Sequence, residues 1–261
     1  MADTTDILLE LSALRRQDAL EREAVESFFE LQNRAVFAPA VRDFESVFAG
    51  EGMHVIAELK RASPSEGMIR DDFNPLALAA ELQDAGATAL SVLCEPHRFL
   101  GSEDYLADVR RTASVPVLYK DFITTRYQIA AARTAGADAV LLIASVLKGE
   151  ELRDLLSFAH GFGMSALVET HDEREIDDAV CAGARIIGVN CRNLRNFTCD
   201  VSLLETLIGK IPGSCVRIAE SGMHTADALR RARDAGADGF LVGTALMRAE
   251  HPGEKLAELI S

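Results

Sequence analysis

The chain has 261 residues, of which 48% are hydrophobic and 26% charged, proportions typical of a globular protein with a large core. Its formal net charge of −14 argues against nucleic acid as a partner, because a phosphate backbone is bound through clustered lysine and arginine side chains. No apolar run reaches the length of a membrane span, so we expect no membrane partner either.

The N-terminus and the cysteines indicate where the protein works. The first segment, MADTTDILLELSALRRQ, places acidic residues before its apolar ones, unlike the basic start of a secretory signal, so we expect no export. The cysteines show neither a paired metal-binding spacing nor a redox CxxC motif; they are Cys94, Cys181, Cys191, Cys199 and Cys215. We therefore expect a reduced, cytoplasmic location.

Residues 5–34 carry a helical pattern, with apolar residues spaced among charges at Ile7, Leu8, Leu11, Leu14, Val25, Phe28, Phe29 and Leu31. No strand signal precedes Val55. We therefore expect an N-terminal helical extension over residues 1–50, packed on a second unit over residues 51–261 within a single domain.

From residue 54 onward the chain repeats one pattern. Four similar segments, DAGATALSVL, TAGADAVLLI, CAGARIIGVN and DAGADGFLVG, begin at residues 84, 134, 181 and 234. Each has the features of a helix end, an Ala-Gly cap and a hydrophobic strand. Their spacing of about fifty residues is twice the length of one strand and one helix, so further units are expected between them.

Eight apolar segments fit strands, at residues 54–60, 89–94, 116–121, 139–144, 165–169, 185–190, 215–220 and 239–243. Helical patterns follow them, beginning near Pro75, Ser102, Thr124, Lys148, His171, Val201, Thr225 and Thr244. Strands that are apolar on both faces and are each followed by a helix indicate a closed parallel barrel, the (β/α)8 or TIM barrel. An open doubly wound sheet is the alternative, but no glycine-rich phosphate-binding motif follows the first strand.

Two charged side chains interrupt the first strand of this barrel. In the stretch HVIAELKRASPSEG, which begins at His54, Glu58 and Lys60 share a face with Ile56, because side chains alternate along a strand. The charges occur only at the C-terminal end of the strand, where the active residues of such barrels gather. Only five of the 27 basic residues are lysines, and Lys60 and Lys120 both stand at strand ends, which favours a titratable ammonium group there. An exposed ion pair at a frayed strand end is the alternative.

The same alternation places polar groups inside the barrel at the ends of other strands, namely Lys120, Glu169, Asn190 and Glu220. Nearby opposite charges favour ionisation whereas burial opposes it, so these groups are suited to act as acid and base. Singly, three of them have simpler explanations. Lys120 has Asp121 beside it for a salt bridge, Glu169 fits the acidic start of a helix, and Asn190 fits a turn.

Glycines at the ends of the last two strands indicate a phosphate site. AESGM at residues 219–223 and LVGTALM at residues 241–247 each precede the start of a helix. Backbone N–H groups at such places bind phosphate, and sites after strands seven and eight recur in this fold; plain turn glycines are the alternative. We expect no metal, because no metal-ligand spacing joins the histidines His54, His97, His171 and His224.

Together these motifs resemble those of a known family. The segments VIAELKRASPSEG, MIRDDFNP, SVLCEPHRFLGS, LYKDFI, LVET, IGVNCRNL, AESG and FLVGTALM, within residues 54–248, are similar in order and spacing to the motifs of indole-3-glycerol phosphate synthase. The resemblance implies a (β/α)8 barrel of tryptophan biosynthesis with no metal or organic cofactor. It also implies a carbon–carbon lyase that converts a phosphorylated small molecule, 1-(2-carboxyphenylamino)-1-deoxyribulose 5-phosphate, to indole-3-glycerol phosphate, carbon dioxide and water.

The resemblance also implies roles for the candidate residues. Lys120 matches the general acid that protonates the ketone oxygen during ring closure, and Glu169 matches the base of the dehydration. Lys60 matches a second lysine, which Glu58 holds. The remaining matches are Asn190 and Glu220 around the amine and reacting carbons, Ser63 and Arg192 at the departing carboxylate, and Ser221, Gly222, Gly243 and Thr244 at the phosphate.

Several positions depart from the family pattern. Cys94 stands where threonine is usual, Cys191 where asparagine or histidine is usual, and Glu66 where lysine is common. By alternation Cys191 points outward, so we expect its effect to be mild, whereas Cys94 and Glu66 are candidates to alter substrate affinity. In the family the N-terminal region helps to cover the substrate's aromatic ring, and the candidates for this role here are Phe44 and Phe48.

Two other functions fit parts of the pattern. A related barrel that isomerises phosphoribosyl compounds would need a cysteine or aspartate base at the first strand end, where Glu58 and Lys60 stand. A catalytically silent, phosphate-binding barrel would have no chemical need of Lys60, Lys120 and Glu169. For the assembly we expect a monomer or a weak homo-oligomer.

Overall fold

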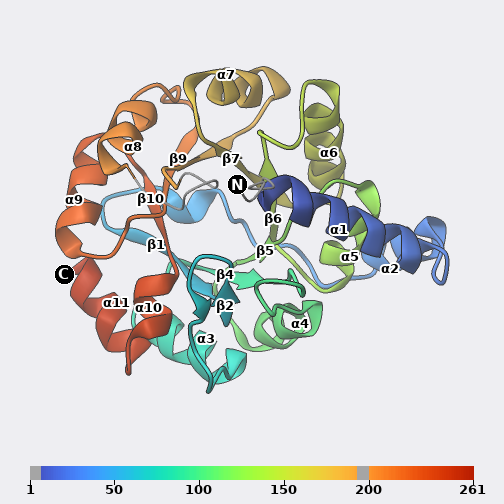
Figure 1. Ribbon diagram of the computed structural model, residues 1–261, viewed down its shortest axis with the longest axis horizontal. Helices are drawn as coiled ribbons and strands as arrows, with labels where there is room; N and C mark the ends of the chain where they lie inside the picture. The colour runs from blue at the N-terminus through green and yellow to red at the C-terminus, as the bar shows by residue number, and fades with distance from the viewer. Residues whose placement is uncertain (1–6, 193–199) are drawn as a thin grey trace, which may run out of the picture.

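Eight parallel strands close into a barrel in the computed structural model, which describes residues 7–192 and 200–261 (Figure 1). In chain order the strands are β1 (His54–Leu59), β4 (Ala89–Leu93), β5 (Val117–Lys120), β6 (Ala139–Ile143), β7 (Ser165–Thr170), β8 (Ile186–Asn190), β9 (Val216–Glu220) and β10 (Gly239–Val242). β10 returns to pair with β1, where Val55 lies beside Phe240. The predicted (β/α)8 barrel is thereby confirmed.

Helices follow the strands and surround the barrel in Figure 1. They are α3 (Pro75–Asp84), α4 (Glu103–Thr112), α5 (Arg126–Thr134), α6 (Glu150–Gly161), α7 (Glu173–Ala182), α8 (Val201–Ile208), α9 (Ala226–Asp234), the short α10 (Thr244–Arg248) and α11 (Pro252–Ile260). The helix predicted from Thr244 is therefore two helices. Of the helices in the part of the chain that is described, none combines the length and apolar character needed to cross a membrane.

The strand side chains form two apolar layers. In β1, Val55, Ala57 and Leu59 join the cluster between the strands and the helices, whereas Ile56 points into the barrel. The other strands supply the rest of the inner layer, with Ala89, Leu118, Ala139, Leu141, Ile143, Leu167, Ile186, Ile218 and Leu241. Because Glu58 follows Ile56 by two residues, the alternation carries its carboxylate to the inner face at the end of the strand.

The loop after β1 contains a feature that the sequence pattern does not indicate. A small antiparallel hairpin forms there from two short strands, β2 (Ala62–Ser63) and β3 (Gly67–Met68). The strands are too short to show a periodicity, so only the turn residues between them mark the loop. The hairpin leaves the side chain of Ser63 buried.

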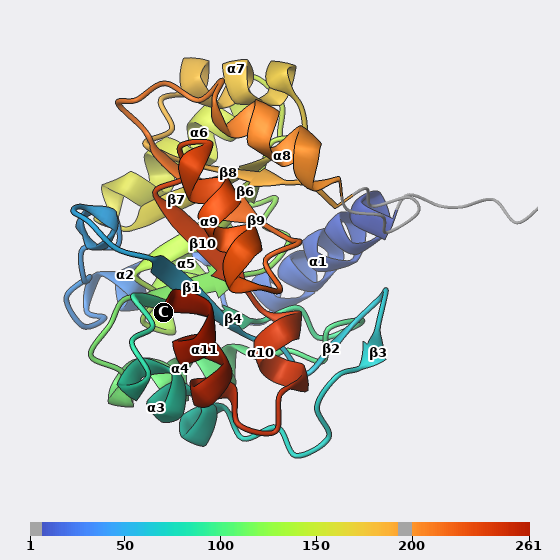
Figure 2. The same cartoon turned by 90° about the vertical axis from the view of Figure 1, so that its left-hand side faces the viewer.

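Two helices precede the barrel, α1 (Ile7–Glu23) and α2 (Phe28–Val36). α2 packs on α5, where Leu31 joins a small cluster with Ala130 and Ala131. α1 lies on the same side of the barrel as the β2–β3 hairpin (Figure 2). The predicted N-terminal helical segment is thus present, and we propose residues 1–50 and 51–261 as the two units of the chain.

Phe44 and Phe48 occupy the N-terminal end of the barrel, so the prediction that they cover a substrate ring is wrong. Phe48 belongs to the 3-10 helix η1 (Ser46–Phe48), and both rings join the inner apolar layer. A Cβ on Gly239, the first residue of β10, would come within 2.7 Å of the Phe48 ring. Because parallel strands all begin at this end, the two rings close the barrel on the side opposite to the charged strand ends.

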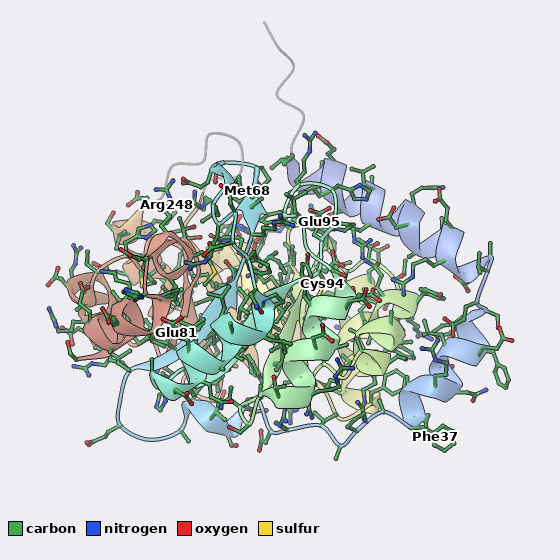
Figure 3. All side chains as sticks on the ribbon, turned by 90° about the horizontal axis from the view of Figure 1, so that it is seen from below. Phe37, Met68, Glu81, Cys94, Glu95 and Arg248 are labelled. Atoms are coloured by element: carbon green, nitrogen blue, oxygen red, sulfur yellow. The ribbon has the colours of Figure 1, made fainter. Side chains whose placement is uncertain are left out.

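We expect Phe48→Ala to lower the free energy of unfolding by about 3–5 kcal/mol, because it leaves a cavity at the closed end of the barrel. The matched control is Phe37→Ala, since Phe37 is 88% exposed whereas Phe48 is 5% exposed. Phe37 projects from the edge of the molecule in Figure 3. Equilibrium unfolding in urea measures both variants, and equal losses would contradict the proposed packing role.

Candidate active site

One cavity opens at the C-terminal ends of the strands, and the twelve residues for which the sequence predicts a part in catalysis or in binding the carboxylate and phosphate all line it. These residues are Glu58, Lys60, Ser63, Lys120, Glu169, Asn190, Arg192, Glu220, Ser221, Gly222, Gly243 and Thr244. They come from β1, β5, β7, β8, β9 and β10 and the loops after them. Barrel closure therefore brings together side chains that lie far apart in the sequence.

Lys120 lies between two carboxylates at the centre of this cavity. Its Nζ donates to Glu220 Oε2 at 2.9 Å and lies 3.6 Å from Glu169 Oε2. The side chains of Lys120, Glu169 and Glu220 are only 13%, 6% and 1% exposed. The simpler interpretation of Lys120, a salt bridge to Asp121, is wrong, because Asp121 pairs with Arg15 instead.

The charges of Lys120, Glu169 and Glu220 shift one another's pKa values in different directions. Burial opposes the charge of Lys120, but the carboxylates of Glu220, Glu169 and Glu58 outweigh it and raise the pKa of the ammonium. Burial also disfavours ionised Glu169, yet the charges of Lys120 and His171 hold its pKa below the ordinary value. Burial, reinforced by the neighbouring Glu169, raises the pKa of Glu220 to about 7. A charged acid thus stands beside an ionised base and a carboxyl group that titrates near neutrality.

A second ion pair joins the end of β1. Lys60 Nζ donates to Glu58 Oε2 at 2.6 Å. Burial alone would raise the pKa of Glu58, but the charges of Lys60 and Lys120 hold it below the ordinary value. The site therefore places a second ammonium group beside the same cavity, held in position by an ionised carboxylate.

Two glycines leave the space that these carboxylates fill. A Cβ on Gly243 would lie 2.1 Å from Glu58 Oε2, and a Cβ on Gly188 would lie 2.1 Å from Glu220 Oε1. A side chain at either position would therefore displace the carboxylate from its place in the cavity. Gly188 lies within β8 and was not singled out from the sequence, because a glycine inside a strand carries no signal of which neighbour needs its space.

Asn190 organises the loops after β8 and β9. Its Oδ1 accepts a hydrogen bond from Ser221 Oγ at 2.8 Å and another from the backbone N–H of Arg192 at 3.0 Å. Ser221 and Gly222 adopt positive φ angles of 65° and 72°. A serine in this region is strained, and such strain occurs where a loop must present backbone groups to a ligand.

Apolar residues line the same cavity and form its apolar wall. α1 contributes Ile7, Leu8 and Leu11, and the loops after the strands contribute Pro64, Phe99 and Phe122. The rings of Phe99 and Phe122 lie 6.1 Å apart. The resemblance implied that the N-terminal region covers the cavity, but not that α1 does so, since helical periodicity shows which face of a helix is apolar but not what that face covers.

Arg15 fastens α1 to the C-terminal end of β5. Its Nε and Nη2 donate to the Asp121 carboxylate at 2.9 and 2.7 Å, and Tyr119 Oη donates to the same carboxylate at 2.9 Å. Arg15 and Asp121 are both buried, so each charge depends on the other. Because Asp121 directly follows Lys120, one strand end carries both the central ammonium group and the anchor for α1.

The positions that depart from the family pattern lie away from the charged groups. Cys94 and Cys191 are buried in the outer apolar layer, as expected for Cys191, so Cys94 does not touch the cavity. Glu66, in the loop between β2 and β3, pairs with Arg248, the last residue of α10. Cys199 lies outside the described residues. Within residues 7–192 and 200–261, no group of three or more His, Cys, Asp or Glu is arranged to hold a metal ion.

Comparison with known proteins identifies close relatives. A family model described as indole-3-glycerol phosphate synthase matches residues 8–259. The protein of that name from Campylobacter jejuni is 50% identical over 206 residues, which cover 79% of this chain and 80% of the relative. The one from Sulfurimonas denitrificans is 43% identical over 257 residues, covering 97% and 98%. The one from Streptomyces griseus is 44% identical over 246 residues, covering 94% and 91%.

Solved structures share the architecture at greater distance. An N-acetylmannosamine-6-phosphate 2-epimerase from Clostridium perfringens matches with a TM-score of 0.63 at 16% identity, over 80% of this chain and 93% of that one. A thiamine phosphate pyrophosphorylase from Pyrococcus furiosus matches with a TM-score of 0.59 at 16% identity, over 79% and 93%. At these identities the likeness shows the barrel fold alone.

We expect Glu169→Gln to lower the pKa of Glu220 from its value of about 7, because the substitution removes a negative charge that disfavours ionised Glu220. Carbon-13 NMR of the glutamate carboxyl groups across a pH titration measures the change. The control is Glu250→Gln at an exposed position that is not among the described residues lining the cavity. An unchanged or higher pKa for Glu220 in the Glu169 variant would show that the two carboxylates are not coupled.

Proposed function

The chain belongs to the indole-3-glycerol phosphate synthase family and is an enzyme of tryptophan biosynthesis, and we propose that it acts as a carbon–carbon lyase. The proposed reaction takes 1-(2-carboxyphenylamino)-1-deoxyribulose 5-phosphate, closes its indole ring, releases the carboxylate as carbon dioxide and removes the ketone oxygen as water. The observation that carries this proposal is the buried cluster of Lys120, Glu169 and Glu220, which offers an acid and a base within one cavity.

Lys120 is the proposed general acid. The ring carbon attacks the ketone carbon, and the ketone oxygen then needs a proton as its charge grows. Two carboxylates around Nζ keep Lys120 protonated, so a proton is available at this point. Lys60 is proposed to assist, since its ammonium group adds positive charge near the developing oxyanion while Glu58 fixes its position.

Glu169 is the proposed base of the dehydration. After carbon dioxide has left, the hydroxyl group departs while a proton is removed from the carbon next to the ring nitrogen. Glu169 is suited to this step because it is ionised and lies beside the acid. Asn190 and Glu220 are proposed to position the amine and the reacting carbons from the neighbouring strands β8 and β9.

The two ends of the substrate have separate proposed sites. Ser63 and Arg192 are proposed to hold the departing carboxylate, and both line the cavity near Lys60. Ser221, Gly222, Gly243 and Thr244 are proposed to bind the phosphate, supported by the backbone N–H groups available after β9 and β10. The aromatic ring is proposed to pack on the apolar wall of Leu8, Leu11 and Phe122 rather than on Phe44 or Phe48.

We propose a cytoplasmic location, a phosphorylated small molecule as substrate, and a monomer or weak homo-oligomer as the working form. No cofactor has a proposed role, because each step is a proton transfer or a bond cleavage that the named side chains can assist. An isomerase of phosphoribosyl compounds fits less well, since the first strand ends in Glu58 and Lys60.

We expect the purified chain to convert the carboxyphenylamino deoxyribulose phosphate, and Lys120→Ala to reduce kcat by about 10²–10⁴-fold, because the variant loses its general acid. Indole fluorescence measures the rate. The control is Lys255→Ala, since Lys255 pairs with Glu258 on the same helix, α11, and is not among the described residues that line the cavity. A parent that binds the compound without forming indole would support a silent barrel, whereas no binding would exclude this substrate.

A further inference from the structure

The proposed reaction consumes a proton from solvent in every turnover, which follows from its atom balance. The ketone oxygen leaves as water and so gains two protons. The carbon beside the ring nitrogen gives up one proton, and the carboxylate leaves as carbon dioxide without giving any. One further proton must therefore reach the buried acid before the next turnover. This inference rests on the proposed function.

His171 lies beside the buried cluster, directly after β7. Its Nε2 is 3.4 Å from Glu169 Oε1, and the other oxygen of that carboxylate, Oε2, is 3.6 Å from Lys120 Nζ. His171 Nε2 is buried and has no hydrogen-bond partner of good geometry among the described residues. Glu169 thus stands between an imidazole on one side and the proposed acid on the other.

Glu175 on α7 holds the imidazole in this orientation. Its Oε2 accepts a hydrogen bond from the backbone N–H of His171 at 2.8 Å and lies 3.3 Å from His171 Nδ1. A carboxylate at Nδ1 stabilises the imidazolium form and directs Nε2 toward Glu169. The arrangement is a continuous series of titratable groups from Glu175 through His171 and Glu169 to Lys120.

The series leads from the interior toward solvent. The side chains of Glu169 and Lys120 are 6% and 13% exposed, whereas those of His171 and Glu175 are 20% and 17% exposed. His171 is not among the described residues that line the cavity, although Glu169 is. A substrate that fills the cavity therefore contacts Glu169 without covering His171.

We propose that His171, held by Glu175, relays protons from solvent through Glu169 to Lys120. The imidazolium gives its Nε2 proton to Glu169 Oε1, breaking the N–H bond and forming an O–H bond. The carboxyl group then turns about its Cγ–Cδ bond so that the protonated oxygen faces Lys120, gives this proton to the neutral amine and becomes ionised again. The neutral imidazole, now protonated at Nδ1 alone, turns about its Cβ–Cγ bond to bring its bare nitrogen to solvent, takes a proton there from water and turns back, so the relay ends with its initial groups restored.

The charges around His171 suit this role. Burial disfavours the imidazolium, but the carboxylates of Glu175 and Glu169, with Glu220 on β9, raise the pKa of His171 above its ordinary value; Lys120 on β5 is the cation on the far side of Glu169. The imidazolium is the competent form and is populated below that raised pKa. Proton supply in the parent therefore declines as the pH rises through it.

The test compares kcat for indole formation over many turnovers by the parent, His171→Asn, Glu175→Gln and the control His251→Asn, across pH and imidazole-buffer concentration; His251 is exposed at the start of α11. We expect the His171 variant to be slower by about tenfold or more at neutral pH, to lose the parent's decline with pH, and to recover as imidazole is added. Glu175→Gln should show the same changes to a smaller degree, and it carries the test if His171→Asn does not fold.

Two results would overturn the relay. The first is a His171 variant with the parent's rate at every pH and buffer concentration. The second is a slower variant whose rate keeps the parent's pH dependence and does not respond to imidazole, which would indicate a purely structural role. A parent that forms no indole would instead remove the proposed function, and the relay with it.

Discussion

The open end of the barrel buries a lysine ammonium group, and this charge must be paired with carboxylates. A buried charge without a partner costs several kcal/mol, so Lys120, Glu169 and Glu220 can only be placed together. Strand register brings them together, since Glu169 pairs with Gly188 in the sheet and Asn190 pairs with Glu220. The absence of a side chain at position 188 then lets the Glu220 carboxylate enter the barrel. Barrel closure and charge pairing thus fix the same geometry.

The position of α1 over the cavity also depends on the C-terminal end of β5. Asp121 receives Arg15 from α1 and Tyr119 Oη, and it adjoins Lys120 in the chain. A shift of α1 would break a buried ion pair at the residue next to the proposed acid. The apolar residues that α1 carries over the cavity are therefore coupled in position to the group that acts below them. An enzyme that must exclude water from an oxyanion gains from such coupling.

Strand alternation explains why so much of the site could be predicted from the sequence. A period of two is a local property, so Ile56 and Glu58 reveal which face is inward without any knowledge of their neighbours. Contacts between distant segments have no such signature. The sequence therefore predicts neither the Arg15–Asp121 ion pair nor the contact between Gly188 and the Glu220 carboxylate. The prediction for Phe44 and Phe48 chose the wrong end of the barrel, because apolar character predicts that a side chain is buried but not at which end of the barrel it lies.

The charge balance of the cavity explains how an acidic chain can take an anionic substrate. The formal charge of −14 is spread over the molecule, and salt screens exposed charges beyond about 8 Å at physiological ionic strength. Within the cavity, Lys60, Lys120 and Arg192 face Glu58, Glu169 and Glu220. With its pKa of about 7, Glu220 is partly protonated near neutral pH, so the cations outnumber the ionised carboxylates.

A bound carboxylate and phosphate would shift that balance further, since added negative charge favours the protonated form of Glu220. By linkage, the proton on Glu220 in turn favours binding of the anion. The substrate complex therefore begins with more protons at the strand ends than the empty cavity holds. A reaction that consumes a proton starts, in such a site, with the proton already near the oxygen that will leave as water.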